Sequence, residues 1–503
     1  MRSARCGPTS PGALRGVIAA VLVATVLVVS AVVVSGIPAE AASTSTSSTT
    51  TVTTAAVPAK WDPRLKPIAD KVARLRKLDF EHPVAAEFLG EAAFRKRVSI
   101  DRGKLSKQDQ RSVERSAAQL RAVGLIGSDV DLVDAVSSAQ SAGVLAYYDP
   151  KTQKITVKGK DLHDVSTRVT VAHELTHALQ DQHFDLQKLD RQAAAAHGST
   201  ALQTLVEGDA VRTENAYERT LSPADQQAYD TENAAISAEA QAETTAKGVP
   251  DSLTVIFQAP YALGQSMLDA VLAQDGTAGV DALFRHPPRA DAAFVTPSTL
   301  LEHRTFQTVK TPALEAGEKR SGKPDVFGSL SLYQVLASRL DDATALSAAD
   351  AWDGDSMITF TDQGKTCLRA TFAGKGTKGI STITGALTQW AAQVPPGTAT
   401  ARRAGDRVTL TACDPGSATT AIPNSPIRSF LSLSNRDGLY AELVQQGLRS
   451  GEAACSADDL VRDPTFTPIL DQSSSDPTAE PDPSAIDAVR TRLREIVAQC
   501  KVT

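Results

Sequence analysis

The sequence predicts a mainly helical α+β protein, and three patterns support this prediction. In the first half, apolar residues recur at three- and four-residue spacing, as at Val113, Ala117 and Leu120, which is typical of helices with one buried face. Two short apolar segments, 143–149 and 154–158, flank a polar turn and predict a pair of strands. The final third alternates apolar and polar residues in three further predicted strands: 357–361, 367–372 and 407–413.

Length and composition bound the protein class. At 503 residues and 42% hydrophobic residues, the chain can hold two or three domains that each bury a core. The formal net charge is -6, and the sequence has no basic stripe and no alternation of basic and aromatic residues. Nucleic acid is therefore not expected as a partner.

The N-terminus predicts export. Arginines near the start precede an uncharged run over 16–36, and Ala39 and Ala41 then form a small-x-small cleavage signal. Residues 1–41 are expected to be a cleaved signal peptide or a membrane anchor, because the run is just long enough to span a bilayer. Either form makes the chain a secreted or cell-surface protein, with membrane attachment in the second case. The Ser/Thr-rich residues 42–60 predict a flexible linker.

A helical N-terminal region is expected over residues 61–142. Its apolar spacing predicts three helices, over 63–78, 83–98 and 106–123. No residue pattern in this region indicates chemistry, so a supporting role is the simplest interpretation.

The strand pair at 143–158 leads into the stretch that indicates chemistry. This stretch reads H-E-x-x-H, with His173, Glu174 and His177 on a helix expected from about 164 to 182. Residues four apart share one helix face, so both imidazoles can bind one metal ion. Glu174 could then accept a proton from water that the metal activates. Two surface histidines on an amphipathic helix are the alternative, but the apolar flanks predict a buried helix, where unpartnered polar groups are costly.

The third metal ligand has two candidates. Glu207 lies in a second predicted helix, 199–221, and Gly208 beside it would let two helices approach closely. His183 has the spacing of the metzincin motif, but that motif needs a glycine where this chain has Gln180. On a continuing helix His183 would face away from His177. Glu207 is therefore the expected ligand.

With Glu207 as third ligand, the chain resembles the gluzincins, and more closely a group of secreted neutral zinc metallopeptidases from actinobacteria. The matching residues are HELTHALQDQHFD at 173–185 and EGDA at 207–210, and the likeness covers about 143–220. The resemblance implies a zincin-like metallopeptidase core, expected over 143–324, with a short sheet, an active-site helix and a helix that bears the glutamate. It also implies that Zn²⁺ is held by His173, His177 and Glu207 and that Glu174 is the general base. The gap from His177 to Glu207 is longer than in thermolysin-like enzymes, so details around their metal ligands are not transferred.

Other residues near these segments could assist. Asp209 and Glu214 are expected partners for the outer nitrogens of the two histidines, with solvated helix charges as the alternative. A further buried helix is expected over 253–275, with a break or kink near Tyr261 because Pro260 and Gly264 lie inside it. Tyr261 is the first choice for stabilising an oxyanion, ahead of the two later histidines, His286 and His303.

The final third predicts a smaller α+β domain over 325–471, with a helix at 380–394 between its strands, then a linker and terminal helix over 472–503. Four cysteines lie in the exported part, which favours two disulfides outside the cytoplasm. Three pairings are open, and pairing of sequence neighbours is expected: Cys367 with Cys413, and Cys455 with Cys500.

These observations favour an exported zinc metallopeptidase that acts on a peptide or protein substrate. A binding protein of the cell envelope on a degenerate peptidase scaffold is the alternative from another class. A metal-dependent amidase acting on cell-wall material is a second alternative.

Overall fold

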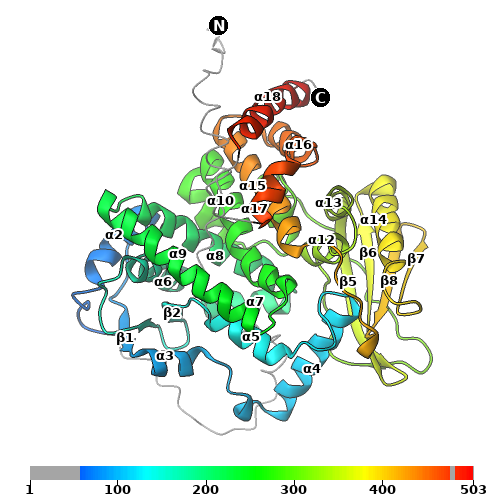
Figure 1. Cartoon of the computed structure of the whole chain (residues 1–503), viewed down its shortest axis with the longest axis horizontal. Coiled ribbons are helices and arrows are strands. Elements are labelled where there is room, and N and C mark those ends of the chain that lie inside the picture. The colour runs from blue at the N-terminus through cyan, green and yellow to red at the C-terminus, as the bar shows by residue number, and fades with distance from the viewer. Residues whose placement is uncertain (1–56, 476–481, 502–503) are drawn as a thin grey trace.

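The computed structural model describes residues 57–475 and 482–501. It confirms the predicted class, since helices dominate and the strands form one small mixed sheet and one five-stranded antiparallel sheet (Figure 1). The predicted signal peptide or anchor, and the linker as far as residue 56, lie outside the described residues. Within the described ranges, no helix is both long enough and apolar enough to cross a membrane.

The small sheet has the order β1-β3-β2, formed by β1 (Ala85–Leu89), β3 (Lys154–Lys158) and β2 (Ala146–Asp149). β2 and β3 are the expected antiparallel pair, and β1 adds to β3 in parallel. The helix expected over 83–98 is therefore wrong in its first half, where β1 precedes α3 (Glu91–Val98). A partner strand about seventy residues further along the chain stabilises β1, and local periodicity does not register such pairing.

Helices α2 and α4 lie where the sequence predicted helices, whereas α5 and the short η2 were not predicted. Ser106 and Asp109 form a capping box at the start of α4, which explains why that helix begins there. The buried face of α2 ends in Arg76, whose side chain is only 1% exposed, and α2 packs against α6 and α8. The elements are α2 (Lys66–Arg76), η2 (Arg102–Lys104), α4 (Lys107–Ala122) and α5 (Leu132–Ser141).

Four consecutive helices form the centre of the first half. The motif lies on α6, which is buried along most of its length and ends where Asp185 takes a left-handed conformation, with φ of 56°. Helices α8 and α9 pack against α6, and α7 packs against both α6 and α8. Their bounds are α6 (Val165–Phe184), α7 (Leu186–Ala195), α8 (Ser199–Glu218) and α9 (Pro223–Ala246).

The long helix α10 (Asp251–Arg285) corrects one prediction. The helix does not break near Tyr261, because it continues through Pro260. The kink lies instead at Gly276, where φ is 66° and ψ is −167°. Packing against α8 on one side and α15 on another holds the helix across the proline, whereas Gly276 adopts a conformation that other residues avoid.

Gly208 permits a close helix contact, but with a different helix from the one expected. A Cβ atom on Gly208 would lie 2.3 Å from the carbonyl carbon of Gly264, so α8 and α10 touch through their backbones. The predicted approach of α8 to the motif helix does not depend on this glycine. The contact with α10 instead fixes the backbone next to Glu207.

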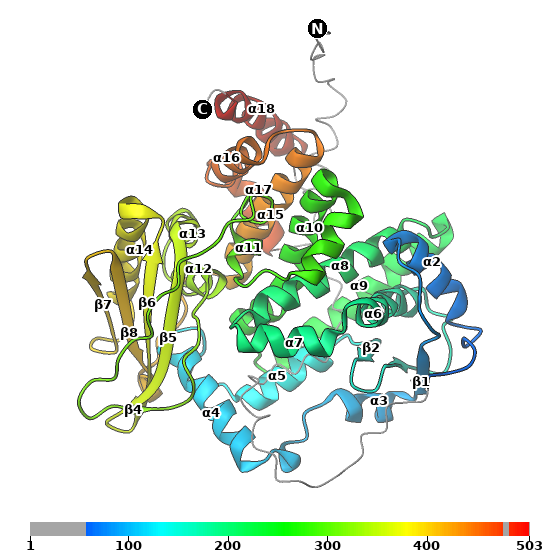
Figure 2. The same ribbon diagram turned by 180° about the vertical axis from the view of Figure 1, so that it is seen from behind.

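The larger sheet has the order β4-β5-β6-β8-β7, with α14 against one face (Figure 2). The helix expected at 380–394 is α14, shifted towards the N-terminus, and strands β4 and β7 were not predicted. One disulfide joins Cys367 of β6 to Cys413 of β8, and the other joins Cys455 to Cys500, so the cysteines pair with their sequence neighbours. The strands are β4 (Lys319–Arg320), β5 (Trp352–Asp362), β6 (Lys365–Gly374), β7 (Ala399–Ala404) and β8 (Arg407–Cys413).

The remaining helices lie in the second half of the chain. Residues 472–475, expected in a linker, belong to α17. The helices are α11 (Ala292–Val295), α12 (Ser329–Ala337), α13 (Asp342–Ala351), α14 (Gly376–Ala391), η3 (Gly416–Ala418), α15 (Pro426–Gln445), α16 (Ser450–Val461), α17 (Thr467–Ser475) and α18 (Pro483–Cys500).

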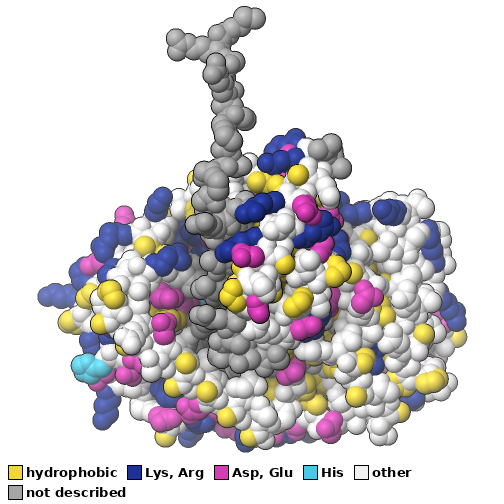
Figure 3. All heavy atoms as spheres, turned by 45° about the horizontal axis from the view of Figure 1, so that its top comes forward, with side chains coloured by type: hydrophobic (Ala, Val, Ile, Leu, Met, Phe, Trp, Pro, Cys, Tyr) yellow, Lys and Arg dark blue, Asp and Glu magenta, His cyan; other side chains and the backbone are white. Residues whose placement is uncertain are grey.

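One hydrophobic core joins the two halves of the chain. It includes Leu205 of α8 and Leu268 of α10, and it continues through Phe372 of β6 and Leu433 of α15 to Leu493 of α18. The outer surface is different: charged side chains of both signs are mixed over the face in Figure 3, with hydrophobic ones scattered between them.

Candidate metal centre

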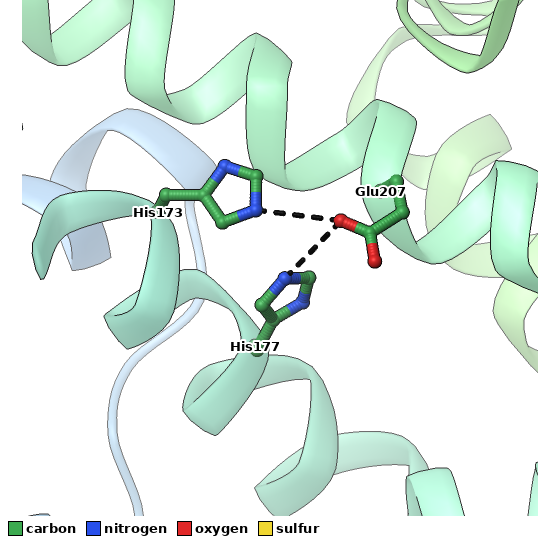
Figure 4. A group of neighbouring side chains, drawn as sticks. All are labelled: His173, His177 and Glu207. Carbon is green, nitrogen blue, oxygen red and sulfur yellow. Dashed lines mark ion pairs between the residues drawn. The ribbon is translucent and has the colours of Figure 1, made fainter. Parts of the chain in front are cut away.

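Helices α6 and α8 bring together the three residues expected to bind metal. His173 Nε2 and His177 Nε2 each lie 3.4 Å from Glu207 Oε2 (Figure 4). The side chains are 0%, 4% and 1% exposed, so these atoms are out of contact with bulk water. The histidines come from one face of α6, as residues four apart on a helix do, and Glu207 faces them from α8.

The outer nitrogens of both imidazoles have partners. His173 Nδ1 lies 2.8 Å from Glu214 Oε2, and a carboxylate so placed accepts a hydrogen bond, so Nδ1 carries the proton. His177 Nδ1 lies 3.0 Å from Gln180 Oε1. In these tautomers each imidazole directs the lone pair of Nε2 towards Glu207. This is the arrangement that metal-binding histidines require.

Three hydrogen-bond acceptor atoms therefore lie close together without a donor among the described residues. Within the described part of the chain, His173 Nε2, His177 Nε2 and Glu207 Oε2 have no hydrogen-bond partner. Buried polar atoms are almost always paired, and a cation between the three would pair all of them. These residues could hold a metal ion, and two imidazoles with one carboxylate suit zinc. Another cluster, Cys455, Asp459 and Cys500, has both sulfurs in a disulfide and lacks free thiolates.

Glu174 lies on the same helix as the histidines and is fully buried. Its Oε2 accepts a hydrogen bond of 2.7 Å from the backbone N–H of Tyr148 in β2, and its Oε1 has no partner among the described residues. Burial raises the pKa of Glu174 to about 7, although the two neighbouring histidines act in the opposite direction. This carboxyl can therefore gain or lose a proton near neutral pH.

The electrostatics of the three ligands are coupled. Burial by itself lowers the pKa of His173, but the neighbouring carboxylates of Glu207 and Glu214 outweigh burial and raise that pKa well above its usual value. The pKa of His177 is also raised, against burial, by the charge of Glu207. Burial would raise the pKa of Glu207, yet the two histidines lower it. In the metal-free protein a proton therefore competes with a cation for this site.

Of the other expected site residues, Asp209 and Tyr261 lie close to the three potential ligands, whereas His183 does not. Asp209 is not in contact with a histidine but accepts a hydrogen bond from Gln180 Nε2 at 3.0 Å. The ring of Tyr261 is stacked on that of His173, with centroids 6.2 Å apart. His183, by contrast, faces away and hydrogen-bonds Asp79 O through Nε2, at 2.7 Å.

His286 and His303 are exposed and lie outside the group of potential ligands. Comparison with protein-family models, curated proteins and solved structures found no match to this chain. The interpretation of the site therefore depends on its own geometry.

Two residues of the site were missed by the sequence analysis. Gln180 was considered only as a position that lacks a glycine, although it follows His177 by three residues and so shares its helix face. That spacing was a usable signal. Tyr148 contributes its backbone N–H to Glu174 and its hydroxyl to Asp181, at 2.8 Å. No sequence pattern indicates a backbone donor of this kind.

Proposed function

We propose that this protein is an exported zinc metallopeptidase of the gluzincin type. The observation that carries the proposal is the meeting of three unpartnered, buried acceptor atoms, from His173, His177 and Glu207, beside a carboxyl oxygen that is also unpartnered. A structural cation would account for the three ligands alone. The carboxylate oxygen of Glu174 that has no hydrogen-bond partner among the described residues is a group suited to proton transfer, which favours a catalytic centre.

The mechanism assigns each residue one task. A zinc ion at this site would supply a Lewis acid that polarises a peptide carbonyl and lowers the pKa of water. Glu174 removes the proton as water attacks the carbonyl carbon, and it later gives that proton to the departing amine. The N–H of Tyr148 holds one oxygen of Glu174 and leaves the other for this transfer. Tyr261, beside His173, is proposed to stabilise the oxyanion.

We also propose that the substrate lies along β2. β2 is an edge strand of the small sheet, and its Tyr148 contacts Glu174. An extended peptide can pair with an edge strand through its backbone, which gives affinity with little demand on sequence. Two disulfides are typical of proteins outside the cytoplasm and support export.

Metal content and hydrolysis test the proposal together. The purified protein is expected to contain one zinc ion per chain by atomic spectroscopy and to digest casein until a chelator is added. Glu174→Gln should keep zinc and lose hydrolysis by about 10²-fold or more, whereas His177→Ala should lose the metal. Zinc without hydrolysis of any peptide would favour a binding protein, and hydrolysis of cell-wall amides alone would favour an amidase. Full activity of Glu174→Gln would refute the assigned role.

A further inference from the structure

The hydrogen bonds behind His177 lead away from the metal centre to helix α2. Gln180 faces His177 through Oε1 and donates from Nε2 to Val206 O and Asp209 Oδ2, at 3.0 Å each. Asp209 Oδ2 also accepts from Arg76 Nε at 2.7 Å. We propose that Gln180 is a positioning residue for His177, and that Arg76 holds Gln180 in place through Asp209.

The amide of Gln180 can lie in only one orientation. Val206 O is a carbonyl and Asp209 is a carboxylate in an ion pair, so both accept hydrogen bonds and the amide must offer its two N–H groups to them. The amide oxygen therefore faces His177, and Nδ1 of that imidazole must donate. The lone pair is left on Nε2, which faces Glu207. Gln180 thus imposes the tautomer that a metal ligand needs.

The amide of Gln180 can fix the tautomer of His177 only if the hydrogen-bond partners of that amide are themselves held in place. Asp209 is 0% exposed, and an isolated buried carboxylate would be strongly unfavourable. Arg76, 1% exposed, compensates that charge and also contacts Asp281 of α10 at 2.7 Å, while Arg212 reaches the other oxygen of Asp209 at 3.2 Å. Arg76 therefore ties the acceptor of Gln180 to a third and a fourth helix.

The same amide links the two helices that supply the ligands. Gln180 lies on α6 three residues after His177, and its partner Val206 immediately precedes Glu207 on α8. One side chain therefore sets both the orientation of an imidazole and the position of the opposite carboxylate. Helix α2, which the sequence assigned only a supporting role, becomes part of the centre.

Gln180→Glu tests this inference, which rests on the proposed zinc site. The substituted side chain keeps its shape and can still accept from His177, but it has no N–H for Val206 O or Asp209. Zinc affinity, measured by competition with a chromophoric chelator, should fall by about 10- to 100-fold. Arg76→Lys keeps the charge but cannot contact Asp209 and Asp281 as a fork, so its zinc affinity should fall as well. It provides the test if Gln180→Glu does not fold.

Gln182→Leu is the matched control. Gln182 lies on the same helix and bonds the N-terminal region through Glu81 N and His82 O, at 2.8 and 3.1 Å, without contacting a ligand. Its zinc affinity should equal that of the wild type, even if thermal stability falls. Equal losses of affinity in Gln180→Glu and Gln182→Leu, or no loss in Gln180→Glu, would overturn the inference. A wild-type protein that binds no zinc would instead refute the proposed function.

Discussion

Gly208→Ala should destabilise the protein, although a glycine-to-alanine substitution at an uncrowded helix position usually stabilises a protein. The added Cβ would lie 2.3 Å from Gly264 C and 2.5 Å from its Cα, well inside the 3.0 Å that Cβ contacts essentially never breach. These are backbone atoms, so α8 or α10 must move by several tenths of an ångström. Overpacking of this kind costs about 1–3 kcal/mol, against a gain in helix propensity of up to ~1 kcal/mol. The net loss should be about 1–2 kcal/mol.

Gly385→Ala supplies the comparison, because Gly385 lies inside α14 and a Cβ there would meet nothing within 4 Å. Chemical denaturation of both metal-free variants should give a lower free energy of unfolding for Gly208→Ala and a higher one, by about 0.5–1 kcal/mol, for Gly385→Ala. Zinc affinity should fall only in Gly208→Ala, since Glu207 adjoins the displaced backbone. If Gly208→Ala is as stable as Gly385→Ala, the close contact of α8 and α10 is wrong.

Two further predictions concern pH and the disulfides. Burial raises the pKa of Glu174 to about 7 and that of Asp355 to about 6, so the folded metal-free protein holds protons that the unfolded chain has released. The contribution of these two carboxyls to the free energy of unfolding should be fully present below about pH 4 and should be lost as the pH rises through 6 and 7. Urea midpoints that increase over this pH range would contradict the prediction. Replacing Cys455 and Cys500 by serine opens a link across 45 residues and should cost about 2–4 kcal/mol in urea unfolding. A midpoint equal to that of the wild type would contradict it.

The parts of the site that follow from local geometry could be predicted from the sequence. His173 and His177 share a helix face by spacing alone. Glu207 was preferred as the third ligand because His183, on a continuous helix, would face away from His177. Of the two expected partners for the histidines, Glu214 contacts His173, whereas Asp209 contacts Gln180. The position of Glu214 in the sequence of α8 does not predict its contact with His173, because that contact depends on how α8 crosses α6.

Features that depend on distant partners could not be predicted. β1 is stabilised by a strand much further along the chain, and the role of Gln180 depends on where α2 places Arg76. Pro260 was expected to break or kink α10, but the helix continues through it where α8 and α15 pack against α10. In each case the local pattern was read correctly, but contacts between distant segments decided the structure.

The core that runs from α8 to α18 has a practical consequence for anyone who wishes to produce only the half of the chain that holds the candidate metal centre. A fragment ending at residue 324 would leave the face of α10 that packs against α15 exposed to water, together with apolar side chains that now meet Leu433 and Leu493. Such a fragment should aggregate rather than yield a smaller soluble protein with the same site.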